Sequence, residues 1–267
     1  MIINDKGTAL ITGASSGLGA IYADRLARDG YDLILVARST AKLEKLAESL
    51  STATARHVRT ISADLTRAKD LEWVEEAMLS DTSVRMLVNN AGAGSTAHLQ
   101  DLDVASIERM IELNVTALTR LARAAAIAFV DRGGGTIVNM GSILAVAPEV
   151  LSGGVYSGTK AYVLAFSQSL RHEFGDKGIR VQVVLPGATA TDFWELSGTP
   201  VQALPANIVM TAEDAVDAAL SGLAQGEFAT FPSLPDINEW NAMEAARRAL
   251  LPGLSRTTPA PRYATGN

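Results

Sequence analysis

The strongest constraint in this sequence is the alternation of short aliphatic runs with longer helical stretches over residues 8–231. The short runs are dense in Val, Ile and Leu, which is typical of strands buried on both faces of a parallel sheet. Gly, Asn and Asp clusters separate the two kinds of segment. We expect strands at 8–12, 32–37, 58–62, 86–90, 136–140, 179–186 and 228–231. We expect helices near 18–29, 40–50, 68–79, 104–130, 157–174 and 211–224.

This alternation predicts βαβ units, and hence one α/β domain with a doubly wound parallel sheet of about seven strands between two layers of helices. Asp103 and Thr211 are suited to cap the helices that follow them. Because no linker interrupts residues 1–235, we expect a single domain over 1–250. Residues 251–267 are rich in Pro, Ser and Thr, and we expect them to form a flexible tail.

The composition favours a small-molecule partner over nucleic acid, a metal ion or a membrane. A net charge of −6 leaves no basic stripe to neutralise phosphates, so we expect no nucleic-acid binding. Cysteine is absent, and His57, His98 and His172 lack the spacing of a metal site. The N-terminus lacks the pattern of a signal peptide, and the apolar stretch ARAAAIAFV is short of the ~20 residues that span a membrane. We therefore expect a cytoplasmic protein.

A glycine-rich loop, TGASSGLG, directly follows the first predicted strand. Glycine allows the positive φ and close backbone approach that a tight turn from strand to helix needs. The N-terminus of the next helix then offers unpaired N–H groups to a diphosphate. Three glycines alone would equally fit an ordinary turn, but their place within a βαβ unit favours a dinucleotide. The expected contacts are Gly13, Ser15, Ser16, Gly17, Leu18 and Gly19.

The end of the second predicted strand favours NADP(H) over NAD(H). An acidic residue there would hold the ribose 2′-hydroxyl, whereas this strand ends with Ala37 and Arg38. A guanidinium group suits a 2′-phosphate, although a solvated surface arginine is the alternative interpretation. Asp64, after the third strand, is placed to accept a hydrogen bond from the adenine amino group. A turn-forming aspartate is the alternative there.

The stretch VYSGTKAY places Tyr156 and Lys160 four residues apart, and therefore on one face of a helix. A nearby ammonium group would lower the pKa of the phenol by ~1–3 units and make Tyr156 useful as an acid or base. Gly158 costs about 1 kcal/mol in a helix interior, which suggests that something approaches it closely. A helix that buries a tyrosine and exposes a lysine is the alternative.

Other polar residues support the catalytic interpretation of this pair. Ser142 follows the fifth strand at the carboxyl edge, where ligands of such sheets bind and where its hydroxyl would polarise a carbonyl oxygen. Asn114 lies in the middle of the long predicted helix, where an asparagine is mildly unfavourable unless it has a role or faces solvent. NNAG (89–92) ends the fourth strand, and PG (186–187) with Thr191 follows the sixth.

Taken in order along residues 6–230, TGASSGLG, NNAG, Asn114, Ser142, YSGTK and PGATAT resemble the motifs of the single-domain short-chain dehydrogenase/reductase family. The resemblance implies a Rossmann-type sheet with strand order 3-2-1-4-5-6-7. It implies that Tyr156 is the acid or base, that Lys160 binds the nicotinamide ribose, that Ser142 orients the carbonyl and that Asn114 holds a water. The remaining expected cofactor contacts are Leu65, Asn90, Ala91, Gly92, Tyr156, Lys160, Pro186, Gly187 and Thr191.

We therefore predict reversible hydride transfer between NADP(H) and a small, largely apolar carbonyl or alcohol substrate. The segments 143–151 and 190–198 are rich in large apolar residues and are expected to line the pocket. The alternatives are an NAD-dependent dehydrogenase, an epimerase or dehydratase, and a cofactor-binding regulator without catalysis. The apolar surface of helices 104–130 and 157–174 predicts a homodimer or homotetramer.

Overall fold

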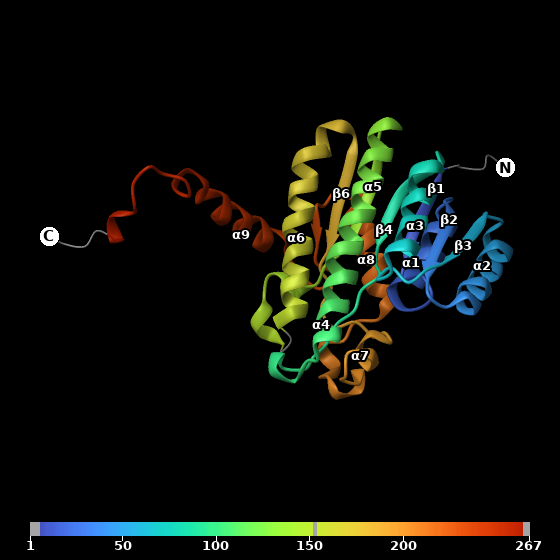
Figure 1. Ribbon diagram of the computed structural model, residues 1–267, viewed down its shortest axis with the longest axis horizontal. Coiled ribbons are helices and arrows are strands. Elements are labelled where there is room, and N and C mark those ends of the chain that lie inside the picture. Colours follow the sequence, from blue (N-terminus) through green and yellow to red (C-terminus); the bar gives the residue numbers. More distant parts are fainter. Residues whose placement is uncertain (1–5, 152–153, 264–267) are drawn as a thin grey trace. The chain divides into compact units, whose positions relative to one another are not determined.

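The computed structural model describes residues 6–151 and 154–263 (Figure 1). Within these residues the strands form one parallel sheet in the order β3-β2-β1-β4-β5-β6-β7, which confirms the predicted doubly wound fold. The strands are β1 (Thr8–Thr12), β2 (Asp32–Ala37), β3 (Val58–Ser62), β4 (Val84–Asn89), β5 (Gly135–Met140), β6 (Ile179–Val184) and β7 (Ala229–Thr230). The last two strands are shorter than predicted, because β7 pairs with only two residues of β6.

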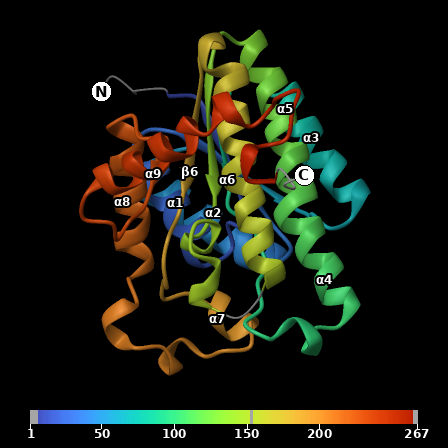
Figure 2. The ribbon, with the colours of Figure 1, turned by 90° about the vertical axis from the view of Figure 1, so that its left-hand side faces the viewer.

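Helices cover both faces of the sheet, as Figure 2 shows. One hydrophobic cluster joins α1, α2 and α8 to one face, and a second joins α3, α5 and α6 to the other. The three layers of the predicted α/β/α architecture are therefore present. The helices of this part of the chain are α1 (Gly17–Arg28), α2 (Thr40–Thr54), α3 (Ala68–Ser80), α4 (Val104–Ile111), α5 (Leu118–Asp131), α6 (Gly154–Phe174), α7 (Phe193–Leu196) and α8 (Ala212–Ala224).

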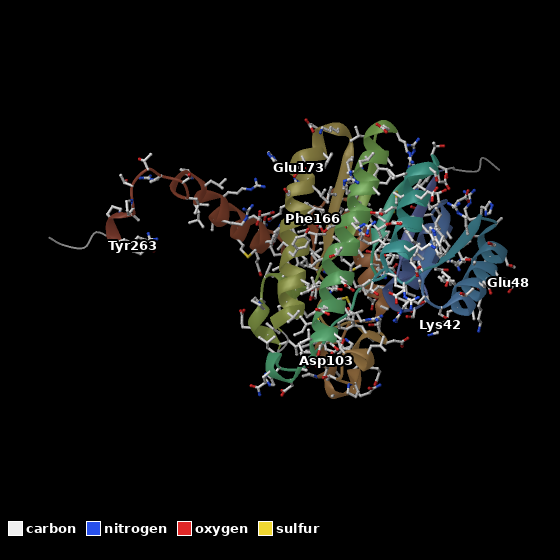
Figure 3. The ribbon with its side chains drawn as sticks, viewed as in Figure 1. Lys42, Glu48, Asp103, Phe166, Glu173 and Tyr263 are labelled. Carbon is white, nitrogen blue, oxygen red and sulfur yellow. The ribbon has the colours of Figure 1, made fainter. Side chains whose placement is uncertain are left out.

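The long helix predicted at 104–130 is continuous but not uniform. A π-helical segment, Glu112–Ala117, joins α4 to α5 and contains the buried Asn114. Asp103 caps the start of α4 (Figure 3), where its carboxylate accepts a hydrogen bond from the Ser106 N–H at 2.8 Å. Single π turns within helices are frequent at functional sites. The structure thus adds a backbone irregularity, at the predicted catalytic asparagine, that periodicity does not reveal.

The same helix, Val104–Asp131, is long and apolar enough to cross a membrane by length and composition alone. In the described residues it is the one helix of that kind, and 56% of its most apolar window is buried inside the structure. Leu121, Ala125 and Phe129 are fully buried within the cluster that packs on the sheet. Packing in the core therefore accounts for the apolar composition of this helix.

The chain divides into two compact units, Met1–Pro232 and Ser233–Asn267. The second contains α9 (Ile237–Ala249), which is capped by the Asp236 carboxylate, and two short 3₁₀ turns, Leu251–Gly253 and Pro261–Tyr263. The expectation of one domain over 1–250 with a flexible tail over 251–267 stays a prediction, and residues 264–267 of that tail lie outside the described residues.

Candidate active site

A cleft of about 1410 Å³ lies at the carboxyl ends of the strands, where the loops after β1, β4, β5 and β6 meet. Both views place α7 and the start of α4 at this end of the first unit (Figures 1 and 2). Nearly all the predicted site residues line this cleft: Gly13, Ser15, Ser16, Gly17, Leu18, Arg38, Asp64, Leu65, Asn90, Ala91, Gly92, Ser142, Tyr156, Lys160, Pro186, Gly187 and Thr191. Asn114 and Gly19 are not among the lining residues.

The glycines of the first loop have the conformations that their prediction requires. Gly13 and Gly17 adopt φ values of 66° and 54°, which disfavour any residue with a side chain. A Cβ on Gly19 would lie 2.3 Å from the Gly13 carbonyl oxygen, so Gly19 permits close packing beneath the loop. The Ser16 side chain does not cap α1. The first turn of α1 is therefore free of a side-chain cap and suited to bind a diphosphate.

Arg38 is exposed and lines the cleft, as the prediction of a 2′-phosphate site requires. Asp64 also lines it, but its carboxylate is engaged in a turn, accepting hydrogen bonds from the N–H and hydroxyl of Thr66 at 3.1 and 2.8 Å. Burial opposes ionisation of Asp64, yet these bonds and the nearby Arg109 and Arg38 outweigh it and lower the pKa of its carboxyl. Asp64 therefore forms the turn that we considered as its alternative role, and its contact with the adenine stays a prediction.

Ser142 and Tyr156 meet through their side chains. Both side chains line the cleft, with the Ser142 hydroxyl close enough to act on the pKa of the phenol, and the Ser142 oxygen accepts a hydrogen bond from the Leu144 N–H at 3.2 Å. Tyr156 is half-buried, and burial raises the pKa of its phenol while the nearby Ser142 hydroxyl acts in the opposite direction. The pair can present one polarised hydrogen-bonding point to a substrate oxygen.

Lys160 lies beside Tyr156, as the four-residue spacing predicts. Its ammonium nitrogen is 5.5 Å from the centre of the Tyr156 ring and donates a hydrogen bond to the Met140 carbonyl at 2.7 Å. Burial lowers the pKa of Lys160 to about 8. Contrary to the prediction that Lys160 brings the pKa of Tyr156 below its usual value, burial of the phenol dominates and raises that pKa, and the ammonium group donates to the backbone.

Asn114 lies behind the cleft in the π-helical segment and is only 1% exposed. Its side-chain oxygen accepts from the Ala93 N–H at 2.9 Å, and its amide nitrogen donates to the Ala93 carbonyl and to the Thr159 hydroxyl, at 2.8 and 3.0 Å. The Thr159 hydroxyl in turn donates to the Tyr156 carbonyl at 2.8 Å. Asn114 thus ties the loop after β4 to the helix that carries Tyr156 and Lys160.

Gly158 does not have the environment that the sequence suggests. It is exposed on α6, and a Cβ built there would have nothing within 4 Å in the described residues. The inference that another group packs closely against Gly158 is wrong for this chain by itself, because no other described part of the chain covers that face of the helix.

Sequence reasoning missed several residues of the cleft. Lys42, in the first turn of α2, and Arg109, on α4, add positive charge to the side lined by Arg38. Lys42 follows Arg38 by four positions, and the Ser39 hydroxyl accepts a hydrogen bond from the Lys42 N–H at 3.5 Å. A helix start directly after the residue predicted to select the cofactor is a signal that could have indicated Lys42. Nothing in the sequence pattern indicates Arg109, because its place depends on how α4 packs.

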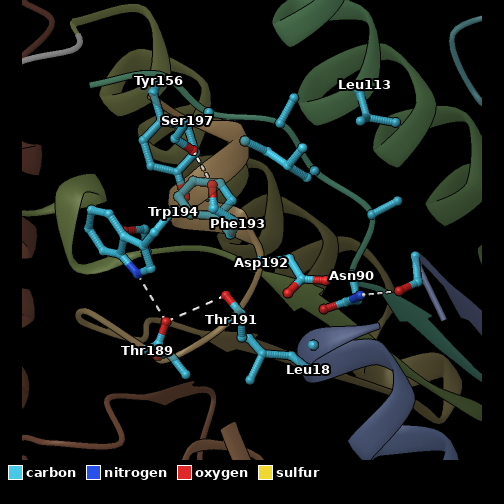
Figure 4. A pocket seen from close by; sticks show the side chains of 18 of the residues that line it. Leu18, Asn90, Leu113, Tyr156, Thr189, Thr191, Asp192, Phe193, Trp194 and Ser197 are labelled. Atoms are coloured by element: carbon cyan, nitrogen blue, oxygen red, sulfur yellow. Dashed lines mark hydrogen bonds between the residues drawn. The ribbon is translucent and has the colours of Figure 1, made fainter. Parts of the chain in front are cut away.

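The cleft has a second, apolar side that the loops after β5 and β6 supply, as predicted for 143–151 and 190–198. Figure 4 shows Phe193 and Trp194 near Tyr156 in this part of the cleft. The large apolar lining residues here are Leu102, Met110, Leu113, Ile143, Leu144, Val150, Leu151, Phe193, Trp194, Leu196, Leu204 and Ile208. In residues 6–151 and 154–263, no three His, Asp or Glu side chains are grouped to hold a metal ion.

The doubly wound sheet, the glycine turn and the adjacent hydroxyl pair define a dinucleotide-binding oxidoreductase. A sequence model of the short chain dehydrogenase family matches residues 7–200, and the chain belongs to this family of enzymes that act on alcohol and carbonyl groups. This confirms the resemblance on which the predicted site residues rest.

Two solved structures are similar over nearly the whole chain. A short-chain dehydrogenase from Sphingobium yanoikuyae, in complex with NADPH, is 45% identical, with a TM-score of 0.93 over 96% of this chain and 100% of that one. A bulky-bulky ketone specific alcohol dehydrogenase from Comamonas testosteroni is 43% identical, with a TM-score of 0.90 over 98% and 100%.

Curated relatives match a smaller part of their own length. Very-long-chain 3-oxoacyl-CoA reductase-A of Danio rerio is 35% identical over 188 residues, which are 68% of this chain and 58% of that protein. The 17-beta-hydroxysteroid dehydrogenase type 3 of Homo sapiens is 31% identical over 221 residues, or 82% and 68%. The chain thus spans about three fifths of the length of the first of these relatives.

Proposed function

We propose that this protein is an NADP(H)-dependent oxidoreductase that interconverts a carbonyl and an alcohol on an apolar substrate, with Tyr156 as the acid or base. The observation that carries the proposal is that Ser142 and Tyr156 line the same cleft as the glycine turn and the large apolar residues. Both Tyr156 and Lys160 are present, which argues against a regulator that has lost its chemistry.

The residues of the chain would divide the work as follows. When bound, the nicotinamide group supplies or accepts a hydride at the substrate carbon. The Ser142 hydroxyl holds the substrate oxygen, and Tyr156 exchanges a proton with it. A phenol is protonated at neutral pH and burial raises the pKa of Tyr156 further, so this residue would be ready to donate a proton in the reducing direction. Lys160, whose ammonium nitrogen lies 5.5 Å from the centre of the Tyr156 ring, would hold the nicotinamide ribose.

The chain has a site that fits NADP(H). Gly13 and Gly17 leave room for a diphosphate at the uncapped start of α1, and Arg38 and Lys42 supply two positive charges at the edge of the same cleft. A 2′-phosphate carries the charge that distinguishes NADP from NAD, and a guanidinium group pairs with it in bidentate fashion. The NADPH in the Sphingobium yanoikuyae structure supports this choice.

The substrate side of the cleft supports an apolar ketone or secondary alcohol. Large aliphatic and aromatic side chains line the cleft around Ser142 and Tyr156. An apolar substrate would cover these side chains, whereas beside a highly polar substrate they would stay in contact with water. Arg109 is the one basic residue from α4 that lines the cleft, and the same residue lies close enough to Asp64 to lower its pKa. The Comamonas testosteroni enzyme is named as specific for bulky-bulky ketones, which supports a ketone as the substrate here.

The proposal is tested in two steps. Titration of the protein with NADPH and with NADH, followed by quenching of tryptophan fluorescence, should show tighter binding of NADPH. Loss of nicotinamide absorbance with a panel of aryl ketones and aldehydes should then reveal turnover. Tyr156→Phe should lower turnover by at least about 10³-fold and leave NADPH binding intact. Turnover that persists in this variant would remove Tyr156 from its role, and binding of neither nucleotide would favour a regulator.

We also propose that the protein forms a homodimer or homotetramer. Ile127 and Val130 on α5 and Tyr162 on α6 are about 40% exposed, and large apolar side chains on adjacent helices are typical of interfaces between subunits. Light scattering coupled to gel filtration tests this proposal, and a stable monomer would contradict it.

We propose in addition that the protein is located in the cytoplasm, as the composition predicts. Cell fractionation tests this location.

A further inference from the structure

A phenylalanine from α7 packs beside the proposed acid or base. The centres of the Phe193 and Tyr156 rings are 5.5 Å apart, and the ring planes are tilted by 43°. On α7, Trp194 meets the Phe193 ring at 88°, with 5.9 Å between their centres. Figure 4 shows these side chains together in the cleft. One side of the Tyr156 ring is therefore occupied by protein before any substrate enters.

The Phe193 ring fits into a notch that a glycine creates. A Cβ built on Gly94 would lie 2.3 Å from Cζ and 2.8 Å from Cε2 of Phe193, and 3.3 Å from the Tyr156 ring. Gly94 is not among the described glycines with positive φ, so the backbone does not require glycine at this position. The close approach of the Phe193 ring is what requires it.

The short helix that carries Phe193 is tied to the rest of the cleft. The Thr96 N–H and hydroxyl donate to the Ser197 carbonyl at 3.1 and 3.2 Å, and the Thr96 hydroxyl also bonds to that of Thr199 at 2.7 Å. On the other side, the indole N–H of the buried Trp194 donates to the Thr189 carbonyl at 2.9 Å. These bonds hold α7 to the loop after β4 and to the segment after β6.

We propose that Phe193 is a specificity-determining residue that limits the size of one of the two substituents on the substrate carbonyl, an inference that rests on the proposed function. The substrate oxygen must reach the Ser142–Tyr156 pair, so one substituent is directed toward the space that Phe193 fills. A methyl group needs little of this space. A longer chain enters only if the Phe193 ring leaves the Gly94 notch, against the hydrogen bonds that hold α7.

The test compares 1-phenylethanone, a methyl ketone, with 1-phenylpentan-1-one, its butyl counterpart. Phe193→Ala should raise the ratio of kcat/KM for the butyl ketone to that for the methyl ketone by about tenfold or more. Val104→Ala, a change of an exposed residue at the same end of the chain's first unit, is the control and should leave the ratio unchanged. An unchanged or lowered ratio in an active Phe193→Ala variant overturns the proposal. If the Phe193→Ala protein does not fold, Phe193→Leu is used in its place.

The notch provides a second, independent test. Gly94→Ala should change the ratio of kcat/KM for the two ketones in the otherwise wild-type protein, because its methyl group displaces the Phe193 ring from the notch, and should leave that ratio unchanged in the Phe193→Ala background. Equal effects in the two backgrounds would overturn the pairing of Gly94 with Phe193.

Failure of the proposed function is distinguished by a binding readout. If the wild type reduces neither ketone, calorimetric titration of each ketone into protein saturated with NADP⁺ gives the same comparison without turnover. Phe193→Ala should then favour binding of the butyl ketone over the methyl ketone by about tenfold. Absence of binding in every variant, or an unchanged ratio of the two dissociation constants, overturns the inference.

Discussion

The ammonium group of Lys160 extends past the Tyr156 ring, 5.5 Å from its centre, and donates its hydrogen bond to the Met140 carbonyl. The cation is thus buried between an aromatic face and the end of β5, with a backbone oxygen as its partner. Such a position is costly for a charge, and the pKa of Lys160 falls to about 8. The stability of the protein should therefore depend on pH through this residue.

The sign of that dependence follows from the two pKa values. The lysine pKa is about 10.4 in an unfolded chain and about 8 in the folded protein, so between these values the unfolded chain binds the proton and the folded chain does not. The free energy of unfolding should rise with pH in this window, and below about pH 8 the full cost of the buried charge remains.

Lys160→Met removes this dependence. Between about pH 7.5 and 9.5, the wild type should gain about 2 kcal/mol of stability relative to Lys160→Met. Denaturant unfolding of both proteins across this range measures the difference, and the comparison cancels the contribution of the other titrating groups. Parallel curves would show that Lys160 is hydrated in solution.

Arg38→Gln tests the cofactor preference. Loss of a charged hydrogen-bond donor to the 2′-phosphate should weaken NADPH binding by about 10- to 100-fold and leave NADH binding unchanged. Arg28→Gln, which changes an exposed arginine paired with Asp24 on α1, serves as the control. Fluorescence titration with both nucleotides measures the effect. An equal loss for NADPH and NADH would contradict a role in 2′-phosphate recognition.

Thr159 links Asn114 to the backbone of the helix that carries Tyr156. Thr159→Val keeps the shape of the side chain but removes the acceptor for Asn114 and the donor to the Tyr156 carbonyl. We expect a loss of about 1–3 kcal/mol in the free energy of unfolding, because the buried amide is left with an unmet donor. Thr159→Ser retains the hydroxyl and should recover most of it. A loss in Thr159→Ser as large as that in Thr159→Val would contradict a stabilising role of the hydroxyl.

Gly158→Ala should stabilise the protein. The residue is helical and exposed, and an added methyl group meets no described atom within 4 Å. Alanine favours the helix over glycine by about 1 kcal/mol, and thermal or denaturant unfolding would show this gain. A destabilised variant would indicate that a second subunit covers this position.

The order and type of the elements were predictable from local pattern. Aliphatic runs, helical periodicity and capping residues such as Asp103 and Thr211 are properties of short segments, and the structure shows both caps. Because parallel strands bring the loops at their carboxyl ends together, the same pattern also brought Gly13, Ser142 and Tyr156 to one cleft. The π-helical segment around Asn114 was not predictable in this way, since residues 104–130 have the pattern of one continuous helix in the sequence.

The sequence by itself therefore determined the fold, the edge of the sheet that carries the cleft and the residue types of the site. The tertiary structure alone decided that burial raises the pKa of Tyr156, that Asp64 bonds to Thr66, and that the Phe193 ring fits the Gly94 notch. The physical reason is that desolvation and close contact depend on which segments meet in space. Segments far apart in the chain meet only when the sheet assembles, and no local pattern records that meeting.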